Sequence, residues 1–193
     1  MNELLQWDIA LFEAINSGLQ NSFLDTVLPL WRNKYIWIPA YLFLISFLLI
    51  NFQKKGLLII LVAVLTIAIA DMTSSRILKK SIQRLRPCKT AQIVDQVHLL
   101  VPCGSGYSFP SSHATNHFAL ALFLIGVAGT RFSKIKLPLL LWAASIAISQ
   151  VYVGVHFPLD ILGGTLLGCL IGFTMSRVLN IAFLNKYPLV APD

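Results

Sequence analysis

The chain has 193 residues, of which 56% are hydrophobic and only 12% are charged. Soluble domains contain about 45–50% apolar and about 25% charged residues, so this composition excludes an ordinary soluble domain and indicates an integral membrane protein. A formal net charge of +7 would suit a nucleic-acid-binding protein. In a membrane protein, however, basic residues mark cytoplasmic loops and contacts with anionic lipids, and we expect no nucleic-acid partner.

Residues 1–35 are expected to form amphipathic helices that lie in the membrane interface. Apolar side chains recur there at helical spacing: Leu4, Leu11, Ile15 and Leu19. A second, shorter helix is expected from about Ser22. The first residues are polar and acidic, not basic and apolar, so no cleavable signal peptide is expected.

Five apolar runs follow, each suited to a transmembrane helix of roughly 20 residues. They are expected at residues 36–52, 57–85, 112–129, 137–153 and 158–180. Aromatic residues at the entry to the first run predict a belt at the membrane boundary, namely Trp31, Tyr35, Trp37 and Tyr41. The predicted fold class is therefore all-α. It is one membrane domain over residues 1–193, with interfacial helices over 1–35 and a transmembrane bundle over 36–184.

The order of these runs predicts the topology. The basic turns at 53–56 and 130–136 fall on one side, and the long loop at 87–110 and the turn at 149–160 fall on the other. The first side carries Lys54, Lys55, Arg131, Lys134, Lys136, Arg177 and Lys186, with only Asp193 against them. The second side also has seven basic residues, so the count alone does not decide. On the second side, however, acidic residues offset the positive charge and several of the basic residues belong to the candidate site. By the positive-inside rule we therefore expect the first side to be cytoplasmic, in a bacterial inner membrane.

Small residues and cysteines mark two further features. Gly164, Gly168 and Gly172 repeat every four residues and predict a face for close helix packing. Cys88 and Cys103 flank the long loop. They are either a disulfide in an oxidising compartment or two unrelated thiols.

Two polar segments on the loop side suit a phosphate group. Lys79 and Arg86 are seven residues apart, which predicts two cations on nearly one helix face. Ser111, Ser112 and His113 open the third apolar run, where free N–H groups at a helix start bind anions. His113 could give a proton to a leaving oxygen.

The third segment holds a histidine with a carboxylate four residues on. Pro158 suits the first turn of a helix, so Asp160 is expected close enough to reach a ring nitrogen of His156. An imidazole that a carboxylate orients is a base or a nucleophile. His117 follows His113 by four residues, but no Glu lies between them as in a His-Glu-x-x-His zinc site, and no metal is expected.

The order Lys-x6-Arg-Pro, Pro-Ser-x-His and Ser-x6-His-x3-Asp resembles the type 2 phosphatidic acid phosphatase (PAP2) family over about residues 57–175. The resemblance implies a membrane lipid phosphatase that works through a phosphohistidine and needs no metal or other cofactor. It implies His156 as nucleophile, Asp160 as its partner and His113 as general acid. The residues that it implies for binding the phosphoryl group are Lys79, Arg86, Ser111, Ser112 and the residue at position 150.

Two positions depart from the family pattern. Ser112 stands where the family usually has glycine, and Gln150 stands where it usually has a phosphate-binding arginine. Glutamine donates hydrogen bonds but carries no charge, and Lys80 or Arg84 could supply the missing cation.

The resemblance favours undecaprenyl diphosphate as the substrate, with the active site at the extracytoplasmic face. Phosphatidylglycerophosphate, phosphatidic acid and lipid A phosphate stay open. Two alternatives are a catalytically impaired homologue that binds lipid without turnover, and a lipid phosphotransferase.

Overall fold

The computed structural model describes residues 3–129 and 133–185, and all regular structure within these residues is helical. This confirms the predicted all-α class. The α-helices are α1 (Glu3–Asn16), α2 (Ser22–Trp31), α3 (Ile38–Asp71), α4 (Lys79–Ile82), α5 (Ser112–Ala128), α6 (Lys136–Tyr152) and α7 (Pro158–Leu179). Two π-helical segments are Met72–Leu78 and Asn180–Leu184. Short 3-10 turns occupy Lys34–Trp37, Pro87–Lys89, Val94–Gln96 and Ser133–Ile135.

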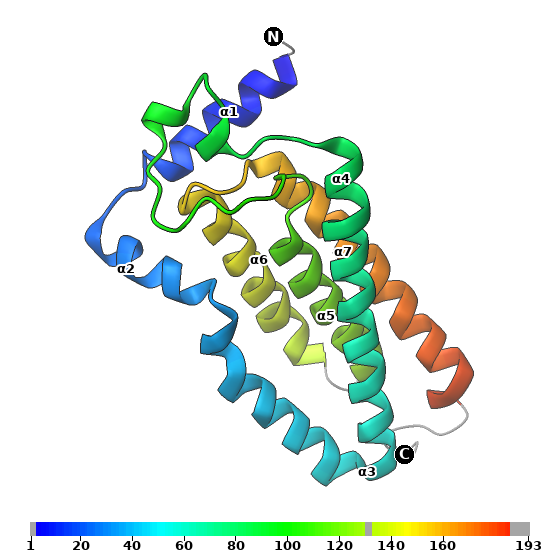
Figure 1. The fold of residues 1–193 in the computed structure, drawn as a ribbon. Coiled ribbons are helices and arrows are strands. Elements are labelled where there is room, and N and C mark those ends of the chain that lie inside the picture. Colours follow the sequence, from blue (N-terminus) through cyan, green and yellow to red (C-terminus); the bar gives the residue numbers. More distant parts are fainter. Residues whose placement is uncertain (1–2, 130–132, 186–193) are drawn as a thin grey trace.

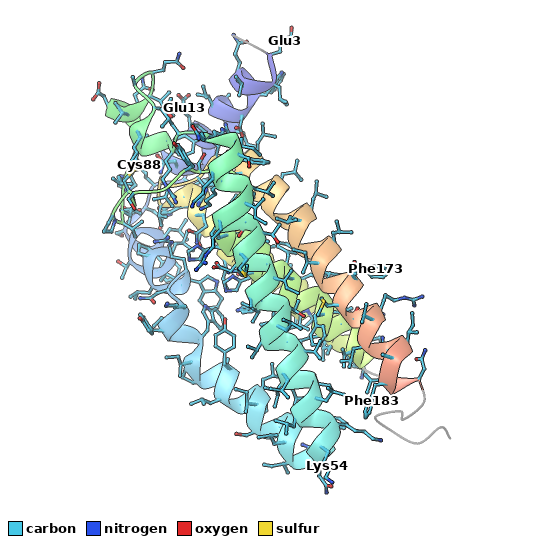
Figure 2. The ribbon with its side chains drawn as sticks, turned by 45° about the vertical axis from the view of Figure 1, so that its right-hand side comes forward. Glu3, Glu13, Lys54, Cys88, Phe173 and Phe183 are labelled. Atoms are coloured by element: carbon cyan, nitrogen blue, oxygen red, sulfur yellow. A yellow bond between two sulfur atoms is a disulfide. The ribbon has the colours of Figure 1, made fainter. Side chains whose placement is uncertain are left out.

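Helix α3 folds back on itself at the predicted basic turn. Gln53 has φ 49° and ψ −121°, and the helix reverses there, so its two arms form a hairpin (Figure 1). The turn is tight, because a Cβ atom on Gly56 would lie 2.0 Å from the carbonyl oxygen of Leu48. Lys54 therefore marks the end of the bundle opposite to Cys88 (Figure 2), as the predicted topology requires.

The second arm of α3 continues through the π-helical segment into α4 and ends at Ile82. The predicted end near residue 85 is wrong, because Gln83 adopts a left-handed conformation (φ 53°, ψ 31°) that stops the helix. Lys79 is helical but Arg86 lies beyond the end, in extended backbone. The two cations therefore do not share a helix face, and a loop carries Arg86 instead.

Helices α5 and α7 pack closely through the predicted small-residue face. Added Cβ atoms on Gly164, Gly168 and Gly172 would lie 2.6, 2.3 and 2.2 Å from carbonyl oxygens of α5 or its N-cap. Only glycine allows the two backbones this approach. This contact holds the start of α5 beside the start of α7.

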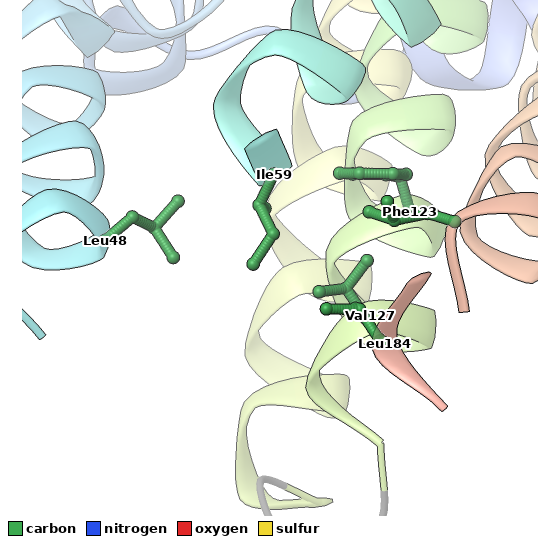
Figure 3. Packing of buried hydrophobic residues seen from close by; sticks show 6 residues of the cluster. Leu48, Ile59, Phe123, Val127 and Leu184 are labelled. Carbon is green, nitrogen blue, oxygen red and sulfur yellow. The ribbon is translucent and has the colours of Figure 1, made fainter. Parts of the chain in front are cut away.

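Apolar side chains fill the middle of the bundle and also cover its outside. Buried residues from α3, α5, the end of α7 and the π-helical segment after it form the largest core cluster (Figure 3), consisting of Leu48, Ile59, Phe123, Val127, Leu179 and Leu184. Large apolar side chains also point outward, and Ile50 is 76% exposed. A helix bundle that is apolar inside and outside is an integral membrane protein.

Three helical stretches are long and apolar enough to cross a membrane, namely Lys34–Lys89, Ser133–Tyr152 and Pro158–Leu184. Ser112–Ala128 is apolar but shorter. Because the first stretch doubles back at Gln53, its two arms together with α5, α6 and α7 give the five arms that the sequence predicts. The number of membrane crossings stays a prediction. Residues 130–132, Lys186 and Asp193, which entered the topology argument, lie outside the described residues.

Helix α1 lies across the end of the bundle (Figure 1) and buries a face of mixed polarity against it. Its buried residues are Asp8, Phe12 and Asn16, whereas Leu4 and Leu11 of the predicted apolar stripe are more than half exposed. The side chain of Asn16 binds the backbone of the long loop and the carbonyl oxygen of Tyr152 at 2.7–2.8 Å. The interfacial helix is therefore also part of the protein core at this end.

The long loop at 87–110 crosses the same end and is closed by a disulfide between Cys88 and Cys103. The sequence left open whether these cysteines form a disulfide or are two unrelated thiols, and the structure shows the disulfide. Ser108 also holds the loop, because its backbone N–H donates to the carbonyl oxygen of Arg84 at 2.8 Å. The loop therefore has a fixed path over the three polar segments.

Candidate active site

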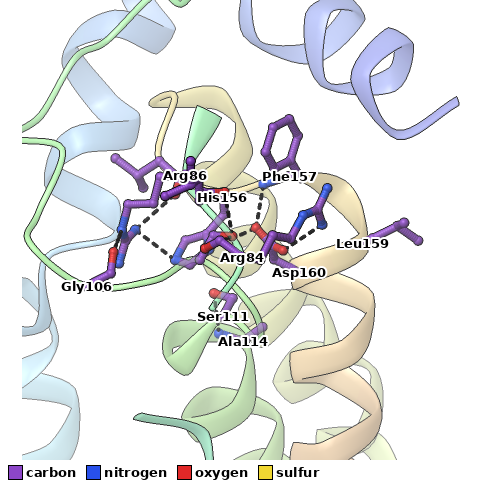
Figure 4. A network of polar contacts seen from close by, with 12 residues as sticks. Arg84, Arg86, Gly106, Ser111, Ala114, His156, Phe157, Leu159 and Asp160 are labelled. Carbon is purple, nitrogen blue, oxygen red and sulfur yellow. Dashed lines mark hydrogen bonds and ion pairs between the residues drawn. The ribbon is translucent and has the colours of Figure 1, made fainter. Parts of the chain in front are cut away.

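His156 lies in the short link between α6 and α7 and is 2% exposed. Its Nδ1 atom is 3.4 Å from Oδ2 of Asp160, in the first turn of α7, as predicted from Pro158. The same carboxylate oxygen accepts the backbone N–H of Phe157 at 2.8 Å (Figure 4). Asp160 thus caps its helix and orients the imidazole at once.

Arg84 fixes this carboxylate from the other side. Its Nη1 atom donates to Oδ1 of Asp160 at 2.8 Å, and its Nη2 atom pairs with Asp8. The Arg84 guanidinium also stacks over the Phe157 ring, 4.3 Å from the centroid. Asp8 in turn accepts the backbone N–H of Leu159 at 2.8 Å. Arg84 therefore has two carboxylate partners, so its charge is already paired and does not supply the missing cation that the sequence suggested.

Arg86 reaches the opposite ring nitrogen of His156. Its Nη1 atom lies 3.3 Å from Nε2 of His156 and donates to the carbonyl oxygen of Val155 at 2.9 Å. Its Nε atom donates to Gly106 in the loop at 2.9 Å. Since a guanidinium has only donors, Nε2 carries the lone pair and Nδ1 carries the proton that faces Asp160.

The protonation of His156 follows from its burial. Burial lowers the pKa of His156 to about 4; the adjacent Asp160 carboxylate opposes this shift, and Arg86 and Lys79 add to it. The imidazole is therefore neutral at physiological pH. A neutral imidazole with a lone pair on Nε2 can act as a nucleophile, and a guanidinium beside it can bind an anion.

The start of α5 lies against the start of α7. The backbone N–H of Ser111 donates to the carbonyl oxygen of Asp160 at 3.0 Å. The Ser111 hydroxyl is buried and caps α5 by accepting from Ala114 at 3.4 Å. The Ser112 hydroxyl accepts from Ser74 at 3.1 Å. The second predicted segment is thus next to the third, with its serines partly engaged in holding the helix start.

His113 and Lys79 complete the set from the sequence. His113 interacts electrostatically with both Lys79 and His156, so the three lie in one region. Its ring is parallel to that of His117, with centroids 6.3 Å apart, and His117 donates from Nδ1 to the His113 carbonyl oxygen at 2.8 Å. Among the described residues, no three His, Cys, Asp or Glu side chains are grouped to hold a metal ion.

Two residues of the site carry no motif signal in the sequence. Asp8 of α1 anchors Arg84, as described above. Arg32, directly after α2, donates from Nε to Oε1 of Gln150 at 3.0 Å. Gln150 is fully buried, and its backbone oxygen accepts the N–H of His156 at 3.2 Å. Asp8 and Arg84 are 76 positions apart, and Arg32 and Gln150 are 118 apart, so motif spacing gives no guide to either contact.

An apolar cavity of about 470 Å³ lies between the first arm of α3, α5 and α6. Aromatic rings connect it to the site, because His117 contacts Trp142 of its wall with centroids 5.0 Å apart. Trp37 packs between Trp31 and Trp142, with centroids 4.6 and 5.5 Å away. Tyr41 also packs against Trp142. Three residues of the predicted aromatic belt thus form a cluster around Trp142, while Tyr35 stays exposed.

Comparison with known proteins identifies the family of this chain. Residues 56–183 match the PAP2 superfamily. A lipid A 4'-phosphatase of Bacteroides thetaiotaomicron is 36% identical over 79% of this chain and 68% of its own length. An undecaprenyl-diphosphatase of Sulfolobus acidocaldarius is 30% identical over 89% of this chain and 78% of its own. The crystal structure of a transmembrane PAP2-type phosphatidylglycerolphosphate phosphatase from Bacillus subtilis has the same fold. It has a TM-score of 0.68 and 24% identity, and the match covers 95% of this chain and 89% of that one.

Proposed function

Because the chain belongs to the PAP2 superfamily and is a membrane-embedded lipid phosphatase, we propose that it works through a phosphohistidine on His156. The observation that carries this proposal is the pair of contacts on the His156 ring. Nδ1 faces Asp160 at 3.4 Å and Nε2 faces Arg86 at 3.3 Å. Nε2 is therefore the nucleophilic atom, and Arg86 lies where it can exchange that contact for a phosphoryl oxygen.

The reaction has two displacement steps. First, the Nε2 lone pair forms a bond to the terminal phosphorus. The bond from that phosphorus to the leaving oxygen breaks, and His113 gives this oxygen a proton. The leaving oxygen is the bridging oxygen of a diphosphate, which departs with the lipid monophosphate, or the alcohol oxygen of a monoester. Second, water attacks the phosphohistidine, His113 takes a proton from the water, and His156 is regenerated with release of inorganic phosphate. Asp160 stabilises the positive charge on His156 through Nδ1, while Lys79 and Arg86 stabilise the charge on the phosphoryl oxygens.

Undecaprenyl diphosphate is our first choice of substrate. A diphosphate carries more negative charge than a monoester, which suits a site with Lys79, Arg86 and few free carboxylates. The apolar cavity beside His117 is suited to a polyprenyl chain, because its lining is almost wholly apolar. The similarity to an undecaprenyl-diphosphatase supports this choice.

Lipid A 4'-phosphate is the second candidate. It is favoured by the relative with 36% identity, which is a lipid A 4'-phosphatase. The same phosphohistidine chemistry can hydrolyse either lipid, so the choice of substrate depends on how the protein binds the polyprenyl chain or the rest of lipid A.

Phosphate release by the purified protein across a lipid panel tests both proposals. Undecaprenyl diphosphate should be hydrolysed with the highest kcat/KM, in the presence of a chelator, and His156→Ala should abolish release. A higher kcat/KM on lipid A would replace the first candidate by the second. Transfer of phosphate to another lipid would indicate a phosphotransferase, and failure on every lipid would indicate an impaired homologue.

We also propose that the site faces the extracytoplasmic side of the inner membrane. The disulfide between Cys88 and Cys103 supports this orientation, because such bonds persist in oxidising compartments. After mild reduction, both thiols should react with an impermeant maleimide added to intact cells. Reaction only after lysis would reverse the orientation.

A further inference from the structure

Arg32 is a partly buried cation that lacks a carboxylate partner among residues 3–129 and 133–185. The ion pairs described there involve Arg84, His98 and His156 instead. Its side-chain hydrogen bond goes to a neutral amide oxygen, on Gln150. A guanidinium has five N–H donors, so most of its donors and its whole charge stay available.

The neighbours of Arg32 add to this excess of positive charge. Burial and the nearby Arg86 charge lower the pKa of Arg32, and Arg32 also interacts electrostatically with His113. Two guanidinium groups held near each other in a partly buried place repel unless an anion lies between them. The side that Arg32 shares with Arg86 and His113 is therefore suited to an anion.

Gln150 holds Arg32 in this position. The Nε2 atom of Gln150 donates to the Ile146 carbonyl oxygen at 3.2 Å, and its Oε1 atom accepts from Arg32. Both ends of the amide are thus occupied within the protein. The backbone oxygen of Gln150 also accepts from Val155 and His156, each at 3.2 Å. One residue therefore connects Arg32 to the segment that carries the nucleophile.

We propose that Arg32 binds a non-bridging oxygen of the transferred phosphoryl group, and that Gln150 is its positioning residue. This inference rests on the proposed function and names a further binding residue of the same site. The N-terminal region thus supplies the guanidinium that the sequence motif lacks at position 150. Arg86 and Arg32 then hold the phosphoryl group from two directions while Nε2 of His156 attacks.

Kinetics of Arg32→Ala on the best lipid of the panel test this role. Removing one charged donor from such a site lowers the rate about 10²–10³-fold, and we expect kcat/KM to fall by that factor. Lys34→Ala is the matched control, because Lys34 is an exposed cation two residues away. An Arg32→Ala enzyme as active as the Lys34→Ala control would overturn the proposal.

A double variant separates charge placement from a structural effect. In Arg32→Ala/Gln150→Arg, the guanidinium returns on the neighbouring side chain, so kcat/KM should recover well above that of Arg32→Ala. Gln150→Arg alone should not exceed the unmodified enzyme, because two guanidinium groups then compete for one place. A double variant that keeps its melting temperature but shows no recovery would contradict the replacement.

Orthovanadate, a phosphate analogue, gives a readout independent of turnover. It should raise the melting temperature of the unmodified protein, and Arg32→Ala should need much more vanadate for the same rise. If no lipid is hydrolysed but this difference holds, the proposed function fails and the role of Arg32 stands. Equal vanadate dependence in both proteins overturns the role of Arg32 even where lipid hydrolysis is real.

Discussion

Residues 56–183, which match the PAP2 superfamily, and residues 3–55, which lie before the match, contribute differently to the same site. The matched region carries the groups proposed to do the chemistry, namely His113, His156 and Asp160. The preceding region carries Asp8, which holds Arg84 and the start of α7, and Arg32, which contacts Gln150. The comparison teaches that reactive groups can sit in a shared core while their support comes from a neighbouring segment.

The two regions also differ in how far their contacts reach along the chain. His156 and Asp160 are four residues apart, so a local turn brings them together. Arg32 and Gln150 are 118 residues apart, and Asp8 and Leu159 are 151 apart. The N-terminal contacts therefore depend on the complete fold, and variants in the two regions should fail in different ways.

Apart from His156→Ala, which should abolish phosphate release, the largest effect is expected in the matched region, from His113→Ala. Loss of a general acid lowers the rate by about 10²–10⁴-fold on a lipid phosphate. On an aryl phosphate, whose leaving oxygen needs no proton, the loss should be much smaller. Steady-state kinetics on both substrates check this, and an equal loss on both would show that His113 does not protonate the leaving group.

In the N-terminal region, Asp8→Ala should act mainly on stability. It removes one of the two carboxylates that hold Arg84 and leaves the Leu159 N–H without its acceptor. Breaking a buried ion pair costs on the order of 3 kcal/mol, so the melting temperature should fall clearly. Glu3→Ala, an exposed carboxylate on the same helix, is the control, and similar melting temperatures for both variants would contradict a bracing role.

A packing change in the matched region should have a smaller effect. In Gly168→Ala the new Cβ atom would lie 2.3 Å from the carbonyl oxygen of Thr115, so α5 and α7 must separate. Such overpacking costs about 1–3 kcal/mol. Gly106→Ala, where nothing lies within 4 Å of the new atom, should melt like the unmodified protein. Equal melting temperatures for both variants would show that the helix contact is not tight.

The smallest difference concerns pH. Burial lowers the pKa of His156 to about 4, so the imidazole stays neutral as the pH falls. Protonation of His156 should therefore reduce kcat/KM only near pH 4. The groups that act on this pKa lie in the matched region, so Asp8→Asn should not change the pH at which kcat/KM falls on the acid side of the profile. A pH profile from about 3.5 to 8 checks it, and a limb near the ordinary histidine value of about 6.5 would contradict the burial argument.

The matched region could be largely predicted from the sequence. Apolar runs gave the helices, and Pro158 predicted the start of α7 and the contact between His156 and Asp160. The end of the second arm could not be predicted, because Gln83 stops the helix through a left-handed conformation that non-glycine residues adopt only in particular surroundings. Arg86 therefore reaches His156 from a loop and not along a helix face.

The N-terminal contribution could not be predicted from spacing. Helical periodicity correctly indicated α1 and the start of α2 at Ser22. It could not show that Asp8 and Asn16 of α1 turn into the protein, since their partners are set by tertiary packing. No signal in the sequence distinguishes Arg32 from other basic residues at a membrane surface. Its one visible clue was the uncharged Gln150 in a motif that otherwise suits phosphate.

The hydrogen bond between Asp8 and the Leu159 N–H can form only late during synthesis of the chain, because its two partners are far apart in the sequence. A ribosome adds about 5–20 residues per second, so 151 residues separate the two partners by roughly 8–30 s. Through that interval α1 is already made, but α7, with Asp160, is not. If the proposed mechanism holds, a growing chain therefore cannot hydrolyse lipid before α7 supplies Asp160, and a product truncated before α7 should be inactive.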